Sequence, residues 1–413
     1  MDPARRWGSA EFTHTLAEVS WMASTAVLMH LNERATGDPA RDWLSSWAHR
    51  CFVGDHLRVL VLGCGEGWLE RAIAAWPFVE HIDAVDVSEE AVARARAEGG
   101  PKIEYGVVDL NVDSLEPGAY DVIVAHSILH HVENLEHAFA QIERAMKPEA
   151  MLIVNEYVGP NRFQFPDEVL DIINELLAAL PEHLRRGHVE QTTYNRRERP
   201  SPEFMIENDP SEAVRSEDLL PMIGDRFEVL ESKKIGGTIL MHLLYDIVQN
   251  FRFEDPHERA LIEMMCATEG ALVDAGAIGC DFAILAARRK GASVRPADRP
   301  LPPRPPAARD VERDPLGFGQ CSGGRLARRA GRGARPRHLA PWLLRILRVV
   351  LASSRPRRAN LIRERRLSAA IEQFRYARSG RAPFAWICGR WSAQDDDPAI
   401  AAMLDAIERV SAR

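Results

Sequence analysis

The chain of 413 residues lacks the patterns that identify several classes of protein. Its six cysteines lie far apart and form no C-x-x-C pair, which argues against a structural zinc site or a disulfide framework and fits a reducing compartment. The N-terminus has no apolar core of the signal-peptide type, and no run of about 18 uncharged apolar residues is present. We therefore expect a soluble, cytoplasmic protein, and no metal site is expected.

Lysine is also absent from the last part of the chain. Residues 291–413 contain 25 arginines, no lysine and 11 acidic residues, whereas the first 290 residues contain 27 basic and 49 acidic residues. The Pro-, Gly- and Arg-rich composition of residues 291–337 is typical of a disordered linker. The expected organisation is a helical cover (1–56), a main domain (57–290) with cap insertions at about 160–222 and 236–278, the linker, and a basic helical segment of unknown role (338–413).

From residue 57 onwards the apolar pattern alternates between strands and helices. The early strands are apolar on both faces, which indicates a mostly parallel sheet covered by helices on both sides. The expected strands are residues 57–63, 81–87, 102–110, 119–127, 150–158, 225–235 and 280–290.

Further helices are expected outside this alternating region. A long helix is predicted over 9–35, another over 211–223 with Ser211 as its N-cap, and two cap helices over 239–252 and 256–275. The polar segment 185–210 is expected to be a loop.

The stretch VLVLGCGEGW, residues 59–68, places Gly63, Gly65 and Gly67 directly after a buried strand. A dinucleotide fingerprint, G-x-G-x-x-G, would need its third glycine where Trp68 stands. Pyrophosphate would also meet the carboxylate of Glu66, whereas S-adenosylmethionine has no phosphate and offers an ammonium group instead. The pattern favours S-adenosylmethionine and leaves a nicotinamide dinucleotide as the alternative.

Over residues 57–158 the chain resembles the class I (Rossmann-like) S-adenosylmethionine-dependent methyltransferases of the small-molecule type. The resemblance is carried by V-L-G-C-G-E-G at 61–67, an acid ending the second strand (Asp86), V-V-D-L-N around Asp109, and A-H-S-I-L-H-H-V at 125–132. It implies an α/β fold with a seven-strand, mostly parallel sheet and helices on both faces.

The resemblance also implies how the cofactor is held. Asp86 would accept hydrogen bonds from the ribose hydroxyls, Asp109 would reach the adenine amino group with Leu110 beside the ring, and the segment from His126 would pass under the methionine moiety. The implied cofactor-binding residues are Gly63, Cys64, Gly65, Glu66, Gly67, Asp86, Val87, Asp109, Leu110 and His126.

Candidate catalytic residues lie after the fourth strand and at the end of the fifth, at the edge where ligands bind in open α/β sheets. A hydroxyl acceptor would need a general base, and His130, His131, Glu156 and Tyr157 are candidates. In a helical turn, His130 and His131 would point about 100° apart, so that only one faces the pocket, and we favour His131.

The expected function is methyl transfer to an O or N atom of a small molecule, with a sugar or a secondary metabolite as the acceptor. Nucleic acid is disfavoured because A-H-S-I stands where amino-methylating DNA enzymes carry N/D-P-P-Y/F, no Pro-Cys dipeptide occurs, and the domain is acidic. Contact of residues 339–354 with a membrane surface is a hypothesis, and the oligomeric state is left open. The alternatives are a non-catalytic cofactor-binding scaffold and an NAD-dependent oxidoreductase.

Overall fold

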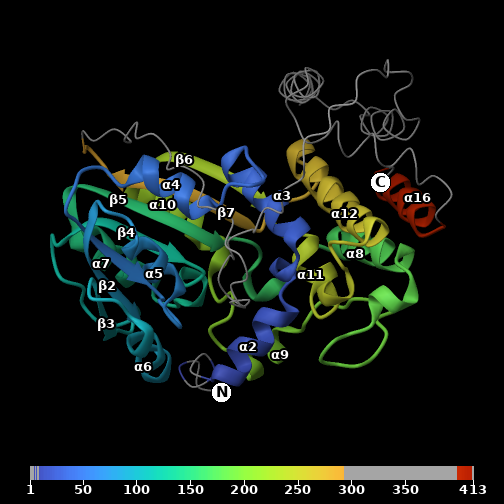
Figure 1. Ribbon diagram of the computed structural model, residues 1–413, viewed down its shortest axis with the longest axis horizontal. Coiled ribbons are helices and arrows are strands. Elements are labelled where there is room, and N and C mark those ends of the chain that lie inside the picture. Colours follow the sequence, from blue (N-terminus) through green and yellow to red (C-terminus); the bar gives the residue numbers. More distant parts are fainter. Residues whose placement is uncertain (1–3, 5, 7–8, 293–397, 412–413) are drawn as a thin grey trace, which may run out of the picture.

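In the computed structural model, seven strands of the described chain form one sheet in the order β3-β2-β1-β4-β5-β7-β6 (Figure 1). Strands β1 to β5 are parallel, and β7 runs antiparallel to both of its neighbours. The expected Rossmann-like, mostly parallel sheet is therefore confirmed. The strands are β1 (Leu57–Leu62), β2 (Val79–Asp86), β3 (Ile103–Val107), β4 (Tyr120–His126), β5 (Met146–Tyr157), β6 (Phe227–Gly236) and β7 (Phe282–Arg289).

The structure describes residues 4, 6, 9–292 and 398–411. Nearly all of the expected linker, and the basic stretch 339–354, lie outside the described residues. The helices are α2 (Ala10–Val19), α3 (Thr25–Thr36), α4 (Trp43–Cys51), α5 (Trp68–Ala74), α6 (Glu89–Glu98), α7 (Leu135–Ala145), α8 (Asp167–Ala179), α9 (Pro202–Asn208), α10 (Leu219–Arg226), α11 (Leu240–Leu244), α12 (Pro256–Ala275) and α16 (Pro398–Ser411). No helix of these residues is long and apolar enough to cross a bilayer.

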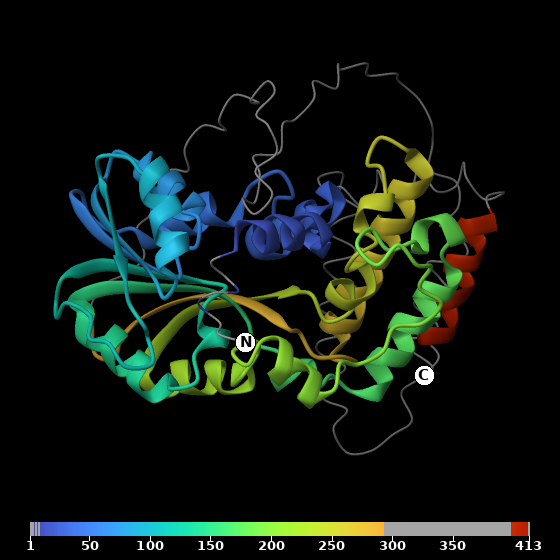
Figure 2. The same cartoon turned by 90° about the horizontal axis from the view of Figure 1, so that it is seen from below.

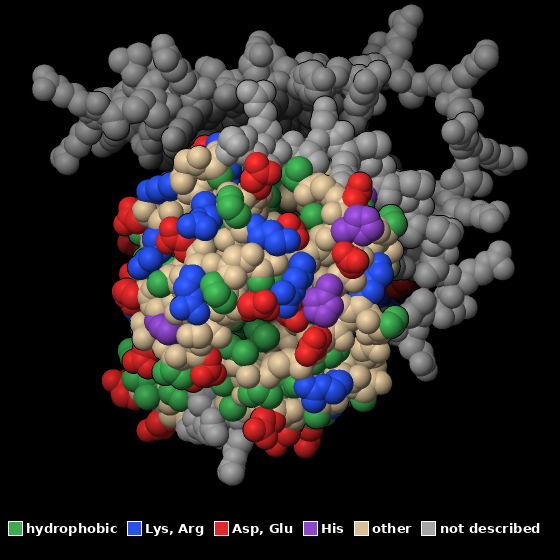
Figure 3. Space-filling view, turned by 90° about the vertical axis from the view of Figure 1, so that its left-hand side faces the viewer, with side chains coloured by type: hydrophobic (Ala, Val, Ile, Leu, Met, Phe, Trp, Pro, Cys, Tyr) green, Lys and Arg blue, Asp and Glu red, His purple; other side chains and the backbone are tan. Residues whose placement is uncertain are grey.

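Helices cover both faces of the sheet, as the apolar strands predict (Figure 2). Side chains alternate along each strand, so Val59 and Val61 of β1 pack on one face and Leu60 and Leu62 on the other. The first face is covered by α3, α4, α5 and α6, and the second by α7 and α10. Figure 3 shows acidic and basic side chains interspersed on the surface at the left-hand side of Figure 1.

The C-terminal helix α16 packs against α8 and α12, which lie much earlier in the sequence (Figure 1). Ile400, Met403 and Ile407 are buried in the same apolar core as the helices of the first face. This part of the expected C-terminal segment therefore belongs to the core.

The single helix expected over 9–35 is wrong. The chain forms α2, a short 3-10 turn η1 (Trp21–Ala23) and α3, because Ser20 and Ser24 have extended backbones and the Ser20 hydroxyl accepts the N–H of Met22. The break brings Trp21 against Phe282 at the start of β7, with ring centroids 5.4 Å apart.

The helix expected over 211–223 is wrong in its first half. Helix α10 begins only at Leu219, after a 3-10 turn η5 (Ser216–Asp218), and Ser211 caps nothing. Ala213 has φ 47°, and the N–H of Val214 donates to the carbonyl of His130 over 3.1 Å. These tertiary bonds hold residues 209–215 in a turn that local helix propensity does not predict.

Two further expectations need correction. The cap helix over 239–252 is interrupted at Asp246 (φ 61°), whose carboxylate accepts the N–H of Val189 and the hydroxyl of Tyr194. The polar segment 185–210 contains the short helix α9, which Ser201 caps. The late strands and the cap helix α12 lie where the sequence predicts them.

Candidate cofactor and acceptor site

The glycine turn follows β1 at the carboxyl edge of the sheet. Gly63, Gly65 and Gly67 all have left-handed backbones, with φ of 68°, 52° and 90°. A Cβ on Gly63 would lie 2.5 Å from the Cβ of Ile128, so this position is closed by the chain itself. A Cβ on Gly65 would meet no described atom within 4 Å. The turn is therefore tightly packed at its first glycine and open to a ligand at its second.

Asp86 ends β2 and fixes the open part of the turn. Its Oδ2 accepts the N–H of Gly65 and its Oδ1 accepts the N–H of Ser88, both over 2.9 Å. Burial raises the pKa of this carboxyl group above its ordinary value, although the two N–H groups oppose the shift. Each carboxylate oxygen retains a further lone pair, so Asp86 can also accept hydroxyl donors of a ligand. The residues present thus fit the amino-acid and ribose parts of S-adenosylmethionine.

Glu66 has partners that the sequence did not suggest. Its Oε1 accepts the hydroxyl of Thr13 over 3.1 Å and the Nε–H of Arg94 over 3.0 Å. Arg94 offsets the negative charge of Glu66, which weakens the argument that Glu66 repels pyrophosphate or is reserved for an ammonium group.

Cys64 is buried, and burial raises the pKa of its thiol. Val87, beyond Asp86, is 37% exposed at the site's rim.

Asp109 follows β3 and is engaged in a local turn. Its Oδ1 accepts both the backbone N–H of Asn111 (2.9 Å) and the side-chain amide of Asn111 (2.8 Å). Leu110 is buried against the second face of the sheet. Asn111, which the sequence interpretation missed, accepts the N–H groups of Glu133 and Asn134 and so ties the exits of β3 and β4 together.

His126, the last residue of β4, lies between two indole rings. The ring centroids of Trp43 and Trp68 are 5.2 Å and 5.5 Å from that of His126. Burial lowers the pKa of His126 to about 4, so the imidazole is neutral near pH 7. Trp43 comes from the N-terminal cover. Because it lies far from His126 in the sequence, the sequence alone did not predict this contact.

A pocket opens beside His126 at the carboxyl ends of β4 and β5, and residues of η1 and α3 form part of its wall. Its polar groups come from Asn32, His126, Ser127 and Asn155, and the rest of its wall is apolar. The lining residues are Trp21, Met22, Leu31, Asn32, Ala35, Trp43, His126, Ser127, Asn155, Ile235 and Phe282.

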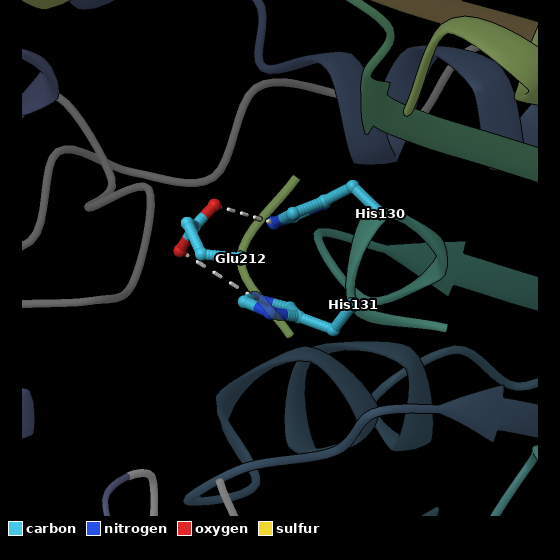
Figure 4. A group of neighbouring side chains, drawn as sticks. All are labelled: His130, His131 and Glu212. Carbon is cyan, nitrogen blue, oxygen red and sulfur yellow. Dashed lines mark ion pairs between the residues drawn. The ribbon is translucent and has the colours of Figure 1, made fainter. Parts of the chain in front are cut away.

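The expectation that His130 and His131 diverge is wrong. They lie in a 3-10 turn, η2 (Leu129–His131), and their ring centroids are 4.2 Å apart. Both rings point toward Glu212 (Figure 4). Burial lowers the pKa of His130, but the carboxylates of Glu156 and Glu212 outweigh it and raise that pKa; burial and the neighbouring His130 lower the pKa of His131.

Glu156 and Tyr157 are both engaged inside the protein. Glu156 is fully buried, and its carboxylate accepts the N–H groups of Ile128 and Leu129 and bonds to the Nδ1 of His130, each over 2.7 Å. The hydroxyl of Tyr157 donates to the carbonyl of Pro160 over 3.0 Å, and burial raises its pKa. The structure therefore brings Glu156 and the two histidines together, whereas Tyr157 packs beside them.

Comparison with known proteins identifies the central part of the chain. A family model described as a methyltransferase domain matches residues 60–154. Over 144 residues the chain is 28% identical to malonyl-[acyl-carrier protein] O-methyltransferase of Halalkalibacterium halodurans, covering 33% of this chain and 52% of that protein. Over 103 residues it is 32% identical to ubiquinone biosynthesis O-methyltransferase of Rickettsia conorii, covering 24% and 34%. The chain thus spans about half or less of the length of these relatives.

Among solved structures, an S-adenosylmethionine dependent methyltransferase from Mesorhizobium loti aligns with 60% of this chain and 97% of its own length, at 18% identity and a TM-score of 0.35. The residues that the family model matches include β1 from Leu60, the glycine turn, Asp86, Asp109 and the histidine turn. Residues 60–154 therefore carry a methyltransferase domain, and this match covers less than half of the chain.

Proposed function

We propose that this protein transfers the methyl group of S-adenosylmethionine to an oxygen or nitrogen atom of a small molecule. The observation that carries the proposal is the turn that is open at Gly65 and aligned by Asp86. The cofactor supplies a methyl group already activated on a sulfonium sulfur, so the protein's task is to bind, orient and exclude water.

The pocket beside His126 is the proposed acceptor site. It adjoins the end of β4, and the N-terminal helices cover it. The pocket is small and its walls are mostly aromatic and aliphatic, which favours an apolar group of the acceptor there over a sugar ring, because a sugar needs many hydrogen-bond partners. Two relatives are named as O-methyltransferases, which favours oxygen as the attacked atom.

A general base at His131 or His130 stays a prediction. Glu156 and Tyr157 are less suited to accept a proton from an acceptor, because the first already accepts bonds from backbone N–H groups and the second donates to Pro160. We assign them to the support of the turn that carries the histidines. The face drawn in Figure 3 carries interspersed acidic and basic side chains, and the first 290 residues hold 49 acidic and 27 basic residues, which supports a small molecule over a nucleic acid.

The test is calorimetric titration of the full chain with S-adenosylhomocysteine and, in parallel, with NADH. We expect binding of the first only, and at least about tenfold weaker binding, about 1.4 kcal/mol, for Asp86→Asn. Asp83→Asn is the control, because Asp83 lies on the same strand but pairs with Arg58, away from the turn.

Transfer of label from the cofactor to a pool of apolar alcohols, phenols and amines then tests catalysis. Binding of NADH alone would favour the oxidoreductase. Tight binding of S-adenosylhomocysteine without transfer to any acceptor would favour the cofactor-binding scaffold.

A further inference from the structure

Three side chains from two distant segments converge beside the candidate site. His130 and His131 come from η2, and Glu212 comes from the turn before α10 (Figure 4). The Nε2 of His130 is 3.6 Å from Oε1 of Glu212, and the Nε2 of His131 is 4.0 Å from Oε2. One ligand-type atom from each residue lies within 4.8 Å of the other two.

The opposite nitrogen of each ring is held by a fixed partner. The Nδ1 of His130 bonds to Glu156 over 2.7 Å, and that carboxylate also accepts two backbone N–H groups. The Nδ1 of His131 is 3.2 Å from the hydroxyl of Ser211, which itself donates to Asp209 and so accepts the imidazole hydrogen. With hydrogens on both Nδ1 atoms, the neutral rings direct Nε2 lone pairs toward Glu212. Metal-binding histidines are oriented in the same way by an outer hydrogen-bond partner.

The backbone also fixes the third residue. The N–H of Val214 donates to the carbonyl of His130, and the N–H of Arg162 donates to the carbonyl of Ala213. The guanidinium of Arg162 donates to the carbonyl of Glu212 over 3.0 Å. Glu212 is thereby held opposite the two rings by main-chain bonds that leave its carboxylate directed at them.

Charge and access both suit a cation. The carboxylates of Glu156, Glu212 and Asp209 lie close to the rings, and Arg6, which pairs with Asp209 over 3.7 Å, and Arg162 lie close to Glu212. Three carboxylates against two guanidinium groups leave a net negative charge around the rings, which favours a cation. The side chains of His130, His131 and Glu212 are 9%, 13% and 19% exposed, so the cluster is largely sheltered but open to a small ion.

We propose that His130, His131 and Glu212 bind one divalent transition-metal ion, with Zn²⁺ as the best fit. Two ligands at about 2.1 Å from Zn²⁺ are about 3.4 Å apart at a tetrahedral angle, close to the separations between the histidine nitrogens and Glu212. Two histidines and one glutamate leave a fourth position for water or an acceptor oxygen, as in catalytic zinc sites. A bound ion would occupy the lone pairs that a histidine base needs, so this metal site and the histidine base of the proposed function are alternatives. The binding itself does not rest on the proposed methyl transfer.

A second group of similar composition gives an internal contrast. His81, Asp83 and Glu104 lie together on β2 and β3, but Arg58 already bonds to the carboxylate of Asp83 over 2.9 Å. Glu104 is exposed, and the guanidinium supplies the positive charge that a metal would bring. We therefore expect His81→Ala to leave metal binding unchanged.

The experiment uses tag-free full-length protein, stripped with a chelator and dialysed. Bound Zn²⁺ is measured by elemental analysis, and affinity by titration with Zn²⁺ and by the visible absorption of Co²⁺ in the same site. We expect one tight equivalent in the wild-type protein and in His81→Ala, and loss of that equivalent in His131→Ala and Glu212→Gln. Ser211→Ala, which removes only the partner of His131, should weaken binding about 10- to 100-fold.

Each variant is checked by circular dichroism, so that loss of binding is separated from loss of fold. The proposal is overturned if the wild-type protein binds no tighter than folded His131→Ala, or if His81→Ala removes the equivalent. In the first case a protonated His130, which directs its Nδ1–H to Glu156 and its Nε2–H to Glu212, is what holds the cluster together. Because binding of S-adenosylhomocysteine is measured separately, failure of the metal site is distinguishable from failure of the proposed methyl transfer.

Discussion

Gly65→Ala should separate cofactor binding from folding. Gly65 has φ 52°, and a Cβ there would meet no described atom within 4 Å. Gly65→Ala should therefore lower the free energy of unfolding only by the cost of placing alanine in the left-handed backbone region, about 1–2 kcal/mol. A ligand approaching the turn would meet a methyl group where it now meets hydrogen, and the affinity for S-adenosylhomocysteine should fall by at least about tenfold, or about 1.4 kcal/mol.

Gly118→Ala is the matched control. Gly118 has φ 62°, and its Cβ would also meet no described atom within 4 Å. It precedes β4, at the opposite edge of the sheet from the glycine turn. The two variants should lose similar stability in urea unfolding, yet only Gly65→Ala should lose affinity in calorimetry.

Gly63→Ala provides the opposite extreme. Its Cβ would lie 2.5–3.0 Å from three atoms of Ile128, in addition to a φ of 68°. We expect this variant to unfold at lower urea concentration than Gly65→Ala. If Gly65→Ala and Gly118→Ala bind S-adenosylhomocysteine with the wild-type affinity, the cofactor does not approach the turn at Gly65, and the reasoning is refuted.

Two further predictions concern stability. Met403→Ala should lower the free energy of unfolding by about 2–5 kcal/mol, because Met403 is fully buried where α16 packs against α8 and α12. As the control, Asp405→Ala at an exposed position of α16 should change the free energy of unfolding by less than about 0.5 kcal/mol. Equal effects of the two variants in urea unfolding would show that α16 does not contribute to the core. Burial raises the pKa of Asp281 from 3.8 to about 7, so the folded chain holds a proton that the unfolded chain has lost, and the free energy of unfolding should fall as pH rises between these values. Asp281→Asn should reduce this slope, and an unchanged slope in unfolding measured across that pH range would contradict the assignment.

The parts of the fold predicted from sequence are those with a local cause. Apolar runs within β1, β4 and β5 (59–62, 122–125 and 150–154) identify these strands by their period and length. The N-cap of α6 also has a local cause, because the hydroxyl of Ser88 accepts the N–H of Ala91 only three residues later. The helix 9–35 was mispredicted because the apolar period continues across Ser20 and Ser24, where the backbone turns.

The candidate site shows the same division. The glycines at 63, 65 and 67 and the acids at 86 and 109 follow strands directly, so the order of strands along the chain placed them at one edge of the sheet. Glu212 was missed because nothing in its own neighbourhood distinguishes it from a helical surface residue. It reaches the histidines only because main-chain bonds to His130 and Arg162 hold its turn in place.

The sequence by itself determined the α/β architecture and indicated the cofactor class and the carboxyl edge where the candidate site lies, since these depend on periodicity and on spacing within short segments. Only the tertiary structure decided which side chains meet across long separations. It enclosed His126 between Trp43 and Trp68, gave Glu66 its partners Thr13 and Arg94, and turned both histidines toward one glutamate. The physical reason is that such contacts follow from the packing of whole elements, which the local pattern of residues does not encode.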